Sequence, residues 1–376
     1  MSLLIDISSL CECDTNHGLE VLQKAATEPR DLDDAPHPNP FLTHLVEMFH
    51  GRGVTRLDEM WKELLSMFDG RSRYDSRALH VRLTPNELAL LRDLLQSGNP
   101  DSYTPDEWML LVDYWTERYL PHSYAVSEAA WLASRAVLMG RLQASMRKTP
   151  RQREIDLALK YADHAPTMAA TQEILAYGRA HCAEYIQAIS DTARHAVKGE
   201  ILDYTRKQAL SGETFSAGRE SLQTKLFDRF GTLNRDWRRI AVTETGEMAN
   251  QAFVAGQAPG TRLKRIERYD ACPFCKKCDG LVLTVVAPDK PEKDPWSEVW
   301  AGSTNYGKSA SPMMRVGDQL VPRPVDQLWT PTAGVFHPHC RGSWVPGGAT
   351  LREGDDPEFH DWLKKLWADK TKEVEA

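Results

Sequence analysis

Apolar and polar positions follow a helical period over most of residues 41–260. Apolar side chains recur every three or four residues, which places them on one face of an α-helix. The clearest stripes are formed by Leu88, Leu91 and Leu95 and by Trp108, Leu111 and Trp115. We expect these side chains to lie in a helical core.

Two expected helix starts carry a capping signature. Thr84 is followed by Pro85 and, three residues after the threonine, by Glu87. The threonine hydroxyl and the glutamate can satisfy backbone N–H groups that have no partner in the first turn, and proline suits the first helical position. Residues 104–107 repeat this pattern. Each copy predicts that a helix begins there.

Three longer stretches without internal proline predict long helices. They cover residues 127–146, 168–196 and 235–255, with breaks near Pro150 and Pro166. The last of them is expected to bury an apolar face formed by Trp237, Ile240, Met248 and Phe253.

Gly231 directly follows another apolar stripe, which consists of Leu222, Leu226 and Phe230. Glycine is common just past the end of a helix, because it adopts the left-handed conformation there without strain. Gly231 therefore predicts that the helix before it ends and that a separate helix begins near residue 235.

The composition changes after residue 256. Proline and glycine are frequent up to residue 346, and short β-prone runs such as residues 281–286 appear. This part is expected to form small strands and loops. A last helix is expected after Pro357, folded back onto the body through Phe359, Trp362, Leu363 and Leu366.

These elements predict a mainly α fold, in which a long-helix bundle is followed by a small α+β C-terminal lobe. The expected divisions are an acidic, proline-rich arm (1–40), an N-terminal helical domain (41–130), a long-helix region (131–255), the α+β lobe (256–350) and a C-terminal helix (351–376). The arm carries too little apolar surface to offset the entropy lost on ordering, so we expect it to be dispensable for folding.

The distribution of charge narrows the class of protein. Residues 1–70 carry a net charge of −8, and the whole chain carries −7. The rest of the chain is therefore close to neutral, and we expect that the chain is no general electrostatic binder of DNA. One local basic cluster could contact phosphates or form a solvated helix end; it consists of Arg141, Arg147, Lys148, Arg151 and Arg153.

The seven cysteines form an odd set, which does not indicate a disulfide framework. The N-terminus shows no apolar signal segment, and no run of apolar residues is long enough to span a bilayer. We therefore expect a soluble protein made in a reducing cytoplasm, with no membrane partner.

The strongest chemical signal is a pair of short motifs. Cys272 and Cys275 are separated by two residues, as are His337 and Cys340 far downstream. Three thiolates and an imidazole complete the tetrahedral shell of Zn²⁺ and leave no position for water or substrate. The spacing predicts a structural zinc site that staples the lobe, with a redox-active cysteine pair or ordinary thiols as the alternatives.

Several motifs also occur in a characteristic order. They are Arg-Arg-Ile-Ala-Val-Thr-Glu-Thr at 238–245, Asn250, Cys-Pro-Phe-Cys at 272–275, Asp-Gly at 279–280, Trp-Ala-Gly-Ser-Thr-Asn at 300–305 and His-Pro-His-Cys-Arg at 337–341. Together they resemble the phage Mu F-like minor head proteins, the head morphogenesis family of tailed phages. The resemblance covers about residues 165–348, and the order of the motifs makes it more specific than any single one.

The resemblance implies a virion protein present in few copies, at the portal vertex or inside the capsid, that acts in head assembly, DNA packaging or DNA delivery. It is made in the host cytoplasm, and its implied partners are the portal protein and other head proteins, with packaged DNA as an option. The implied zinc ligands are Cys272, Cys275, His337 and Cys340.

The chain departs from the family pattern at two positions. Gly342 stands where the family's His-Pro-x-Cys-Arg-Cys run often ends in cysteine, and Cys278 is an additional cysteine. Cys278 or His339 could therefore replace one of the four ligands.

Other functions are weaker. The motifs of zinc deaminases, metalloproteases, P-loop NTPases and nucleophile-elbow hydrolases are absent, so we expect no enzymatic activity. Glu244 could be read as a catalytic acid, but its helical spacing favours a buried polar contact. Arg341 could bind a phosphate or form a structural salt bridge. Two alternatives remain: an enzyme with an unrecognised site, and a sequence-tolerant DNA-binding zinc module, favoured if Lys276, Lys277 and Arg341 share a face.

Overall fold

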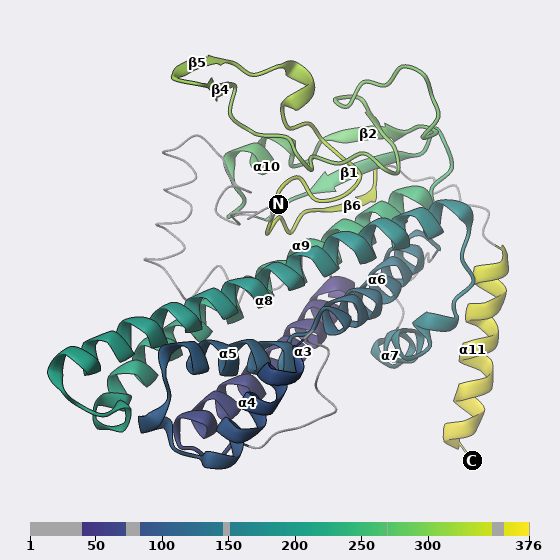
Figure 1. The fold of residues 1–376 in the computed structure, drawn as a ribbon. Coiled ribbons are helices and arrows are strands. Elements are labelled where there is room, and N and C mark those ends of the chain that lie inside the picture. The colour runs from purple at the N-terminus through teal and green to yellow at the C-terminus, as the bar shows by residue number, and fades with distance from the viewer. Residues whose placement is uncertain (1–39, 73–82, 146–150, 269, 348–356, 376) are drawn as a thin grey trace. The chain divides into compact units, whose positions relative to one another are not determined.

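The computed structural model describes residues 40–72, 83–145, 151–268, 270–347 and 357–375. Its helices are α3 (Pro40–Phe68), α4 (Pro85–Ser97), α5 (Pro105–Tyr119), α6 (His122–Ser145), α7 (Gln152–Lys160), α8 (Ala169–Ser211), α9 (Arg219–Ala255), α10 (Pro273–Cys278) and α11 (Pro357–Glu375). The strands are β1 (Arg262–Ile266), β2 (Val282–Val285), β3 (Glu298–Val299), β4 (Met313–Val316), β5 (Gln319–Pro322) and β6 (Ser343–Pro346). The fold is mainly α, with a small sheet region toward the C-terminus, as the sequence predicts (Figure 1).

The chain forms two compact units, and each is assembled from stretches that are far apart in sequence. One unit combines Met48–Glu128 with His181–Arg238. The other combines the described residues up to Glu47 with Ala129–Ala180 and Arg239–Ala376. Helices α3, α6, α8 and α9 each contribute residues to both units. The predicted divisions of the chain stay predictions, and the predicted arm, apart from the start of α3, lies outside the described residues.

The unit that contains α4 and α5 has an aromatic core. Trp108 and Phe215 stack with ring centroids 4.4 Å apart, and Phe68 meets Trp108 edge-on at 5.7 Å. Leu111 and Trp115 are buried beside them on α5. The stripe read from the sequence is thus a core face, as expected, because one apolar side of the helix must be removed from water.

Both predicted capping boxes are present. The hydroxyl of Thr84 accepts a hydrogen bond from the backbone N–H of Glu87 at 3.3 Å, and the Glu87 carboxylate accepts one from the Thr84 backbone N–H at 2.7 Å. Thr104 and Glu107 repeat these bonds at the same distances. These local bonds explain why α4 and α5 begin where they do.

Helix α9 continues through Gly231, so the predicted helix end at this residue is wrong. A Cβ added at Gly231 would meet no atom within 4 Å, so no close approach requires the glycine. The buried stripe continues on both sides of it, through Leu222, Leu226, Phe230, Leu233 and Trp237. Packing of this continuous face outweighs the weak helix propensity of one glycine. Helix α8 likewise runs past the predicted end at residue 196, as far as Ser211.

The C-terminal lobe contains a four-stranded sheet in the order β3-β2-β1-β6. The central strand β1 is antiparallel to β2, with Leu263 opposite Leu283, and antiparallel to β6, while β3 runs parallel to β2. Leu263, Leu283 and Trp344 are fully buried in the lobe's apolar cluster. Strands β4 and β5 form a separate hairpin.

Helix α11 folds back onto its own unit, as the sequence predicts. Phe359 and Leu363 are buried, and the indole N–H of Trp367 donates to the Glu154 carbonyl of α7 at 3.2 Å. The Arg141 guanidinium lies 4.0 Å above the Phe359 ring. Figure 1 shows α11 running beside α7.

Among the helices that the structure describes, not one combines the length and the apolar character that crossing a bilayer requires.

Candidate metal centre

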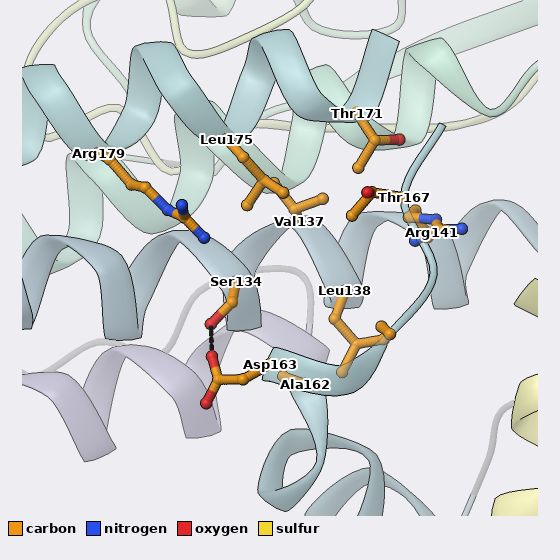
Figure 2. A pocket seen from close by; sticks show the side chains of 11 residues that line it. Ser134, Val137, Leu138, Arg141, Ala162, Asp163, Thr167, Thr171, Leu175 and Arg179 are labelled. Carbon is orange, nitrogen blue, oxygen red and sulfur yellow. Dashed lines mark hydrogen bonds between the residues drawn. The ribbon is translucent and has the colours of Figure 1, made fainter. Parts of the chain in front are cut away.

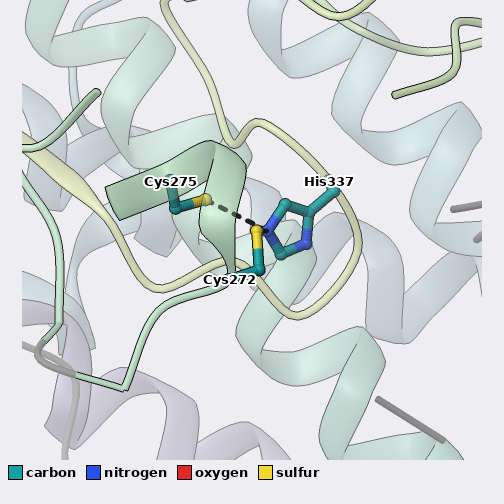
Figure 3. Close-up of side chains that lie close together, drawn as sticks. All are labelled: Cys272, Cys275 and His337. Atoms are coloured by element: carbon teal, nitrogen blue, oxygen red, sulfur yellow. Dashed lines mark hydrogen bonds between the residues drawn. The ribbon is translucent and has the colours of Figure 1, made fainter. Parts of the chain in front are cut away.

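The first cysteine pair lies at the start of α10. Cys272 is the N-cap residue and Pro273 occupies the first helical position. Proline fits this position because its backbone dihedral is already helical and its missing N–H is not needed. The Lys276 backbone N–H donates to the Cys272 carbonyl at 2.9 Å, which closes the first turn. One turn therefore carries both thiols, Cys272 and Cys275 (Figure 3).

The second pair lies on a tight turn between β5 and β6. The Cys340 backbone N–H donates to the His337 carbonyl at 3.1 Å. His339 adopts a left-handed conformation with φ of 65°, which is uncommon for a residue other than glycine. Its backbone N–H donates to the Thr243 hydroxyl of α9 at 2.7 Å. This contact holds the turn so that His337 and Cys340 both face α10.

The four predicted ligands converge. His337 Nε2 lies 3.3 Å from Cys272 Sγ and 3.1 Å from Cys275 Sγ, and Cys275 Sγ lies 3.8 Å from Cys340 Sγ. A tetrahedral zinc ion would hold two sulfurs about 3.8 Å apart, and a sulfur and a nitrogen about 3.6 Å apart. These three distances are close to those of a tetrahedral shell. The donor atoms of Cys272, Cys275 and His337 lie within 4.8 Å of one another, as do those of Glu267, Cys275 and Cys340, so the cluster can hold a metal ion.

The imidazole of His337 is oriented for coordination. Its Nδ1 donates to the Pro338 carbonyl at 2.7 Å, which leaves the lone pair of Nε2 facing the thiols. This second hydrogen bond is the one that metal-binding histidines usually make, because it fixes the tautomer and the ring plane. The Trp329 ring stacks on the imidazole at 5.3 Å and restricts its rotation.

Protons bound by some members of the cluster compete with a metal ion for the donor atoms. The hydrogen bond to Cys275 lowers the pKa of Cys272 to about 3. Burial alone would lower the pKa of His337, but the hydrogen bond to Cys272 and the charge of Cys340 raise it to about 10. Hydrogen bonds to Cys272 and Cys340 raise the pKa of Cys275. A metal ion must displace these protons, so its affinity falls as the pH falls.

A buried ion pair lies directly behind Cys340. The Arg265 guanidinium is fully buried, donates to Cys340 Sγ at 3.4 Å and donates to the Glu267 carboxylate at 2.7 Å. It also donates to the Gly334 carbonyl at 3.2 Å and lies 4.0 Å above the Phe336 ring. Arg265 therefore ties β1 to the segment that carries His337 and Cys340.

One polar face of α9 holds this segment from the other side. The Glu247 carboxylate accepts from the Val335 backbone N–H at 2.7 Å, and Asn250 donates to the Gly342 carbonyl at 2.9 Å. Gln251 donates to the Ser303 carbonyl at 2.8 Å. Together with Thr243, these residues follow the spacing of a single helix face. They satisfy the backbone of loops that have no regular strand partners.

The two possible substitute ligands do not join the cluster. Cys278 is buried in the apolar cluster of the lobe. Among the described residues it belongs neither to the group of Cys272, Cys275 and His337 nor to that of Glu267, Cys275 and Cys340, whose donor atoms could hold a metal ion. His339 is engaged through Nε2 with the Arg341 guanidinium at 3.1 Å. At Gly342, an added Cβ would lie 2.0 Å from a Glu267 oxygen, so Arg265 and Glu267 fill the space beside this glycine.

The other residues singled out from the sequence are mostly buried. Glu244 is buried, as expected. Arg341 is also buried, so it does not share an exposed face with Lys276 and Lys277, which are exposed. Arg141 is buried against α11 and is not part of a solvated basic cluster; Arg147 and Lys148 lie outside the described residues.

Sequence reasoning did not single out Arg265 and Glu267, although a signal was present. Residues of β1 alternate between exposed and buried positions, and Arg265 occupies a buried one. A charged residue at an inward-facing position of a strand indicates a specific buried partner.

The chain matches no protein-family model, and comparisons with curated proteins and with solved structures gave no match.

Proposed function

We propose that this chain is a minor head protein of a tailed phage, with a structural zinc ion in its C-terminal lobe. It would reside in the virion, at the portal vertex or inside the capsid, and act in head assembly, DNA packaging or DNA delivery. Its partners would be the portal protein and other head proteins.

One observation carries the proposal: motifs that are scattered along the sequence meet around a single cluster. Thr243 and Asn250, from the motif on α9, bond to the backbone of His339 and Gly342. Residues 300–305 bond to α9 as well, through Gln251. The order of motifs that resembles the head morphogenesis family therefore corresponds to one packed arrangement, and that correspondence supports a shared architecture.

Zinc is the ion that suits the donor set. Three thiols and one imidazole are soft or borderline ligands, and they are typical of closed structural zinc sites. Because all four positions would be filled by protein, the ion would stabilise the lobe and bind no substrate. This closed shell favours a structural role over an enzymatic one.

The DNA-binding alternative has lost part of its basis. It required Lys276, Lys277 and Arg341 to share a face, but Arg341 is buried beside His339. The Lys277 ammonium lies 4.9 Å above the Trp296 ring.

The proposal is tested in the phage that encodes the chain. Deleting the gene is expected to give particles that form poorly or fail to infect, and a plasmid copy is expected to restore infectivity. Quantitative mass spectrometry of purified virions should find the protein in few copies, with cross-links to the portal protein. Absence from virions, or full infectivity without the gene, would refute the proposal.

A matched pair of variants separates a structural role from chemistry. Glu244→Gln keeps the size of a buried side chain and removes its charge, so the folded variant should enter heads and support infection. Cys275→Ser removes a metal ligand and should fail in complementation. A Glu244→Gln protein that enters virions in normal amounts but blocks packaging or delivery would indicate a chemical role instead.

A further inference from the structure

Reactive side chains are unevenly distributed in the unit that contains the C-terminal lobe. A cavity of about 100 Å³ lies between α6 and α8 (Figure 2). Its carboxylate is already engaged, because Asp163 accepts from Ser134 at 2.6 Å and pairs with Arg135 at 3.2 Å. No cysteine lines this cavity. The cysteines that the structure describes in this unit lie at or beside the candidate metal centre; they are Cys272, Cys275, Cys278 and Cys340.

Two of these thiols are in direct contact. Cys275 Sγ of α10 lies 3.8 Å from Cys340 Sγ, which belongs to the turn before β6, 65 residues further along the chain. Both side chains are buried. The S–S bond of a disulfide is about 2.05 Å long, so each sulfur would have to move by only about 1 Å, which small rotations of the two side chains can supply.

A histidine contacts both cysteines at the start of α10. His337 Nε2 lies 3.3 Å from Cys272 Sγ and 3.1 Å from Cys275 Sγ (Figure 3). A disulfide within this cysteine pair would close only one turn and would leave the 337–340 segment without a link to α10. The structure therefore favours Cys340, and not Cys272, as the oxidation partner of Cys275.

Contacts within the protein hold Cys340 in this position. The Arg265 guanidinium donates to Cys340 Sγ at 3.4 Å, and the Cys340 backbone N–H donates to the His337 carbonyl at 3.1 Å. The neighbouring backbone N–H of His339 donates to the Thr243 hydroxyl at 2.7 Å. These contacts fix one side of the sulfur pair, as the first turn of α10 fixes the other.

We propose that Cys275 and Cys340 are a redox pair: hydrogen peroxide converts them to a disulfide, which replaces a metal ion as the link between α10 and the 337–340 segment. One thiolate attacks the peroxide, the O–O bond breaks, and a sulfenic acid and a hydroxide ion form. The second thiolate displaces a hydroxide ion from the sulfenic sulfur and forms the S–S bond. Two protons, from the thiols or from solvent, convert the two hydroxide ions to water.

Contact and burial both favour this product. The sulfenic acid forms against the partner sulfur, whereas a second peroxide molecule must enter a buried site, so disulfide formation precedes oxidation to a sulfinic acid. The disulfide uses two of the four predicted ligands, so it excludes a tetrahedral ion. Formation of the disulfide requires no metal, and only its role as a replacement for the ion rests on the proposed zinc site.

Hydrogen peroxide is the probe, applied to the purified full chain. After oxidation, free thiols are alkylated in denaturant and the chain is digested with trypsin without reduction. Trypsin leaves residues 269–276, which include Cys272 and Cys275, on one peptide and Cys340 on another. Mass spectrometry should find these two peptides joined, with fragment ions that place the bond at Cys275. A bond that involves Cys272, or sulfinic acids without any disulfide, would overturn the proposal.

Cys278→Ser is the matched control. Cys278 is buried in the apolar cluster of the lobe and, among the described residues, belongs to neither group whose donor atoms could hold a metal ion. The variant should form the same disulfide in the same yield as the wild type. A lower yield would show that Cys278 takes part in the oxidation and would contradict the assignment of the pair.

A second measurement follows the stability of the lobe. A chelator should lower the Tm of the reduced chain and leave that of the oxidised chain unchanged, because the disulfide links the same two segments as the ion. Dithiothreitol should restore the effect of the chelator. A disulfide-linked chain that still loses Tm in the chelator would refute the replacement of the metal link. If the disulfide forms in a chain that carries no zinc, the proposed zinc ion fails and the redox pair stands.

Discussion

Charge balance around Cys340 is decided by single residues. A divalent ion bound by three thiolates leaves one net negative charge, and burial of that charge costs free energy unless a cation lies nearby. Arg265 supplies this cation at 3.4 Å from Cys340 Sγ. Burial raises the pKa of Glu267 to about 7, and the Arg265 guanidinium opposes that shift. Arg265 thus orients Cys340 and places a positive charge beside the loaded site.

Replacing single cysteines with serine tests which of them bind the metal. Cys275→Ser is expected to abolish metal retention and to unfold the lobe, because the free energy of binding is also folding free energy in such sites. Cys278→Ser is the matched substitution, three residues further on, and should retain the metal although it buries a hydroxyl. Metal content per chain, measured by atomic emission, checks both. Full metal retention in Cys275→Ser would remove the site assignment.

The role of Arg265 can be tested without changing any of the four predicted ligands. Arg265→Met combined with Glu267→Gln removes the cation and leaves no unpaired buried carboxylate. Metal affinity should fall by about 10- to 100-fold, as is typical when a partner of a metal ligand is lost. Lys264→Met, at the neighbouring exposed position of β1, should leave it unchanged. Competition with a chromophoric chelator measures both affinities, and equal values would show that Arg265 only fills space.

At the scale of the elements, α9 carries two different packing faces, one in each half of the helix. Its first half carries the buried stripe around Gly231, and its last turns carry the polar face that holds the metal loops. One uninterrupted helix therefore contributes residues to both compact units.

Two glycine substitutions test the continuity of α9. Gly231→Ala should stabilise the protein by about 0.5–1 kcal/mol, because alanine favours a helix interior and a Cβ there meets no atom within 4 Å. Gly212→Ala should destabilise it by about 1–2 kcal/mol, since Gly212 has φ of 73° at the end of α8. Urea unfolding curves give both values. Destabilisation by both would indicate that α9 is broken at Gly231.

For the whole molecule, the interleaving of the two units matters most. Each unit draws on stretches that are separated by more than fifty residues, and four helices belong to both. The unit that begins at Met48 is incomplete until residues from His181 onward have been made. Folding of each unit therefore depends on contacts between distant parts of the sequence.

Burial also predicts how many residues can be removed from the N-terminus without loss of stability. Removal of the residues before Phe41 should leave the Tm nearly unchanged, because an acidic, proline-rich arm buries little apolar surface. Removal up to residue 49 should lower it strongly, since Leu42, Leu45 and Phe49 are buried. Differential scanning calorimetry compares the two truncated proteins. A loss of several degrees from the shorter truncation would show that the arm is docked.

By itself, the sequence determined the features that depend on near neighbours. The capping residues Thr84 and Thr104 mark helix starts, and the ligand pairs at 272–275 and 337–340 are set by spacing within one turn. Tertiary structure alone decided that α9 passes through Gly231 and that Arg265 lies against Cys340, 75 residues away. The reason is physical: caps and periodicity act over a few residues, whereas packing and the burial of charge are settled only when distant segments meet.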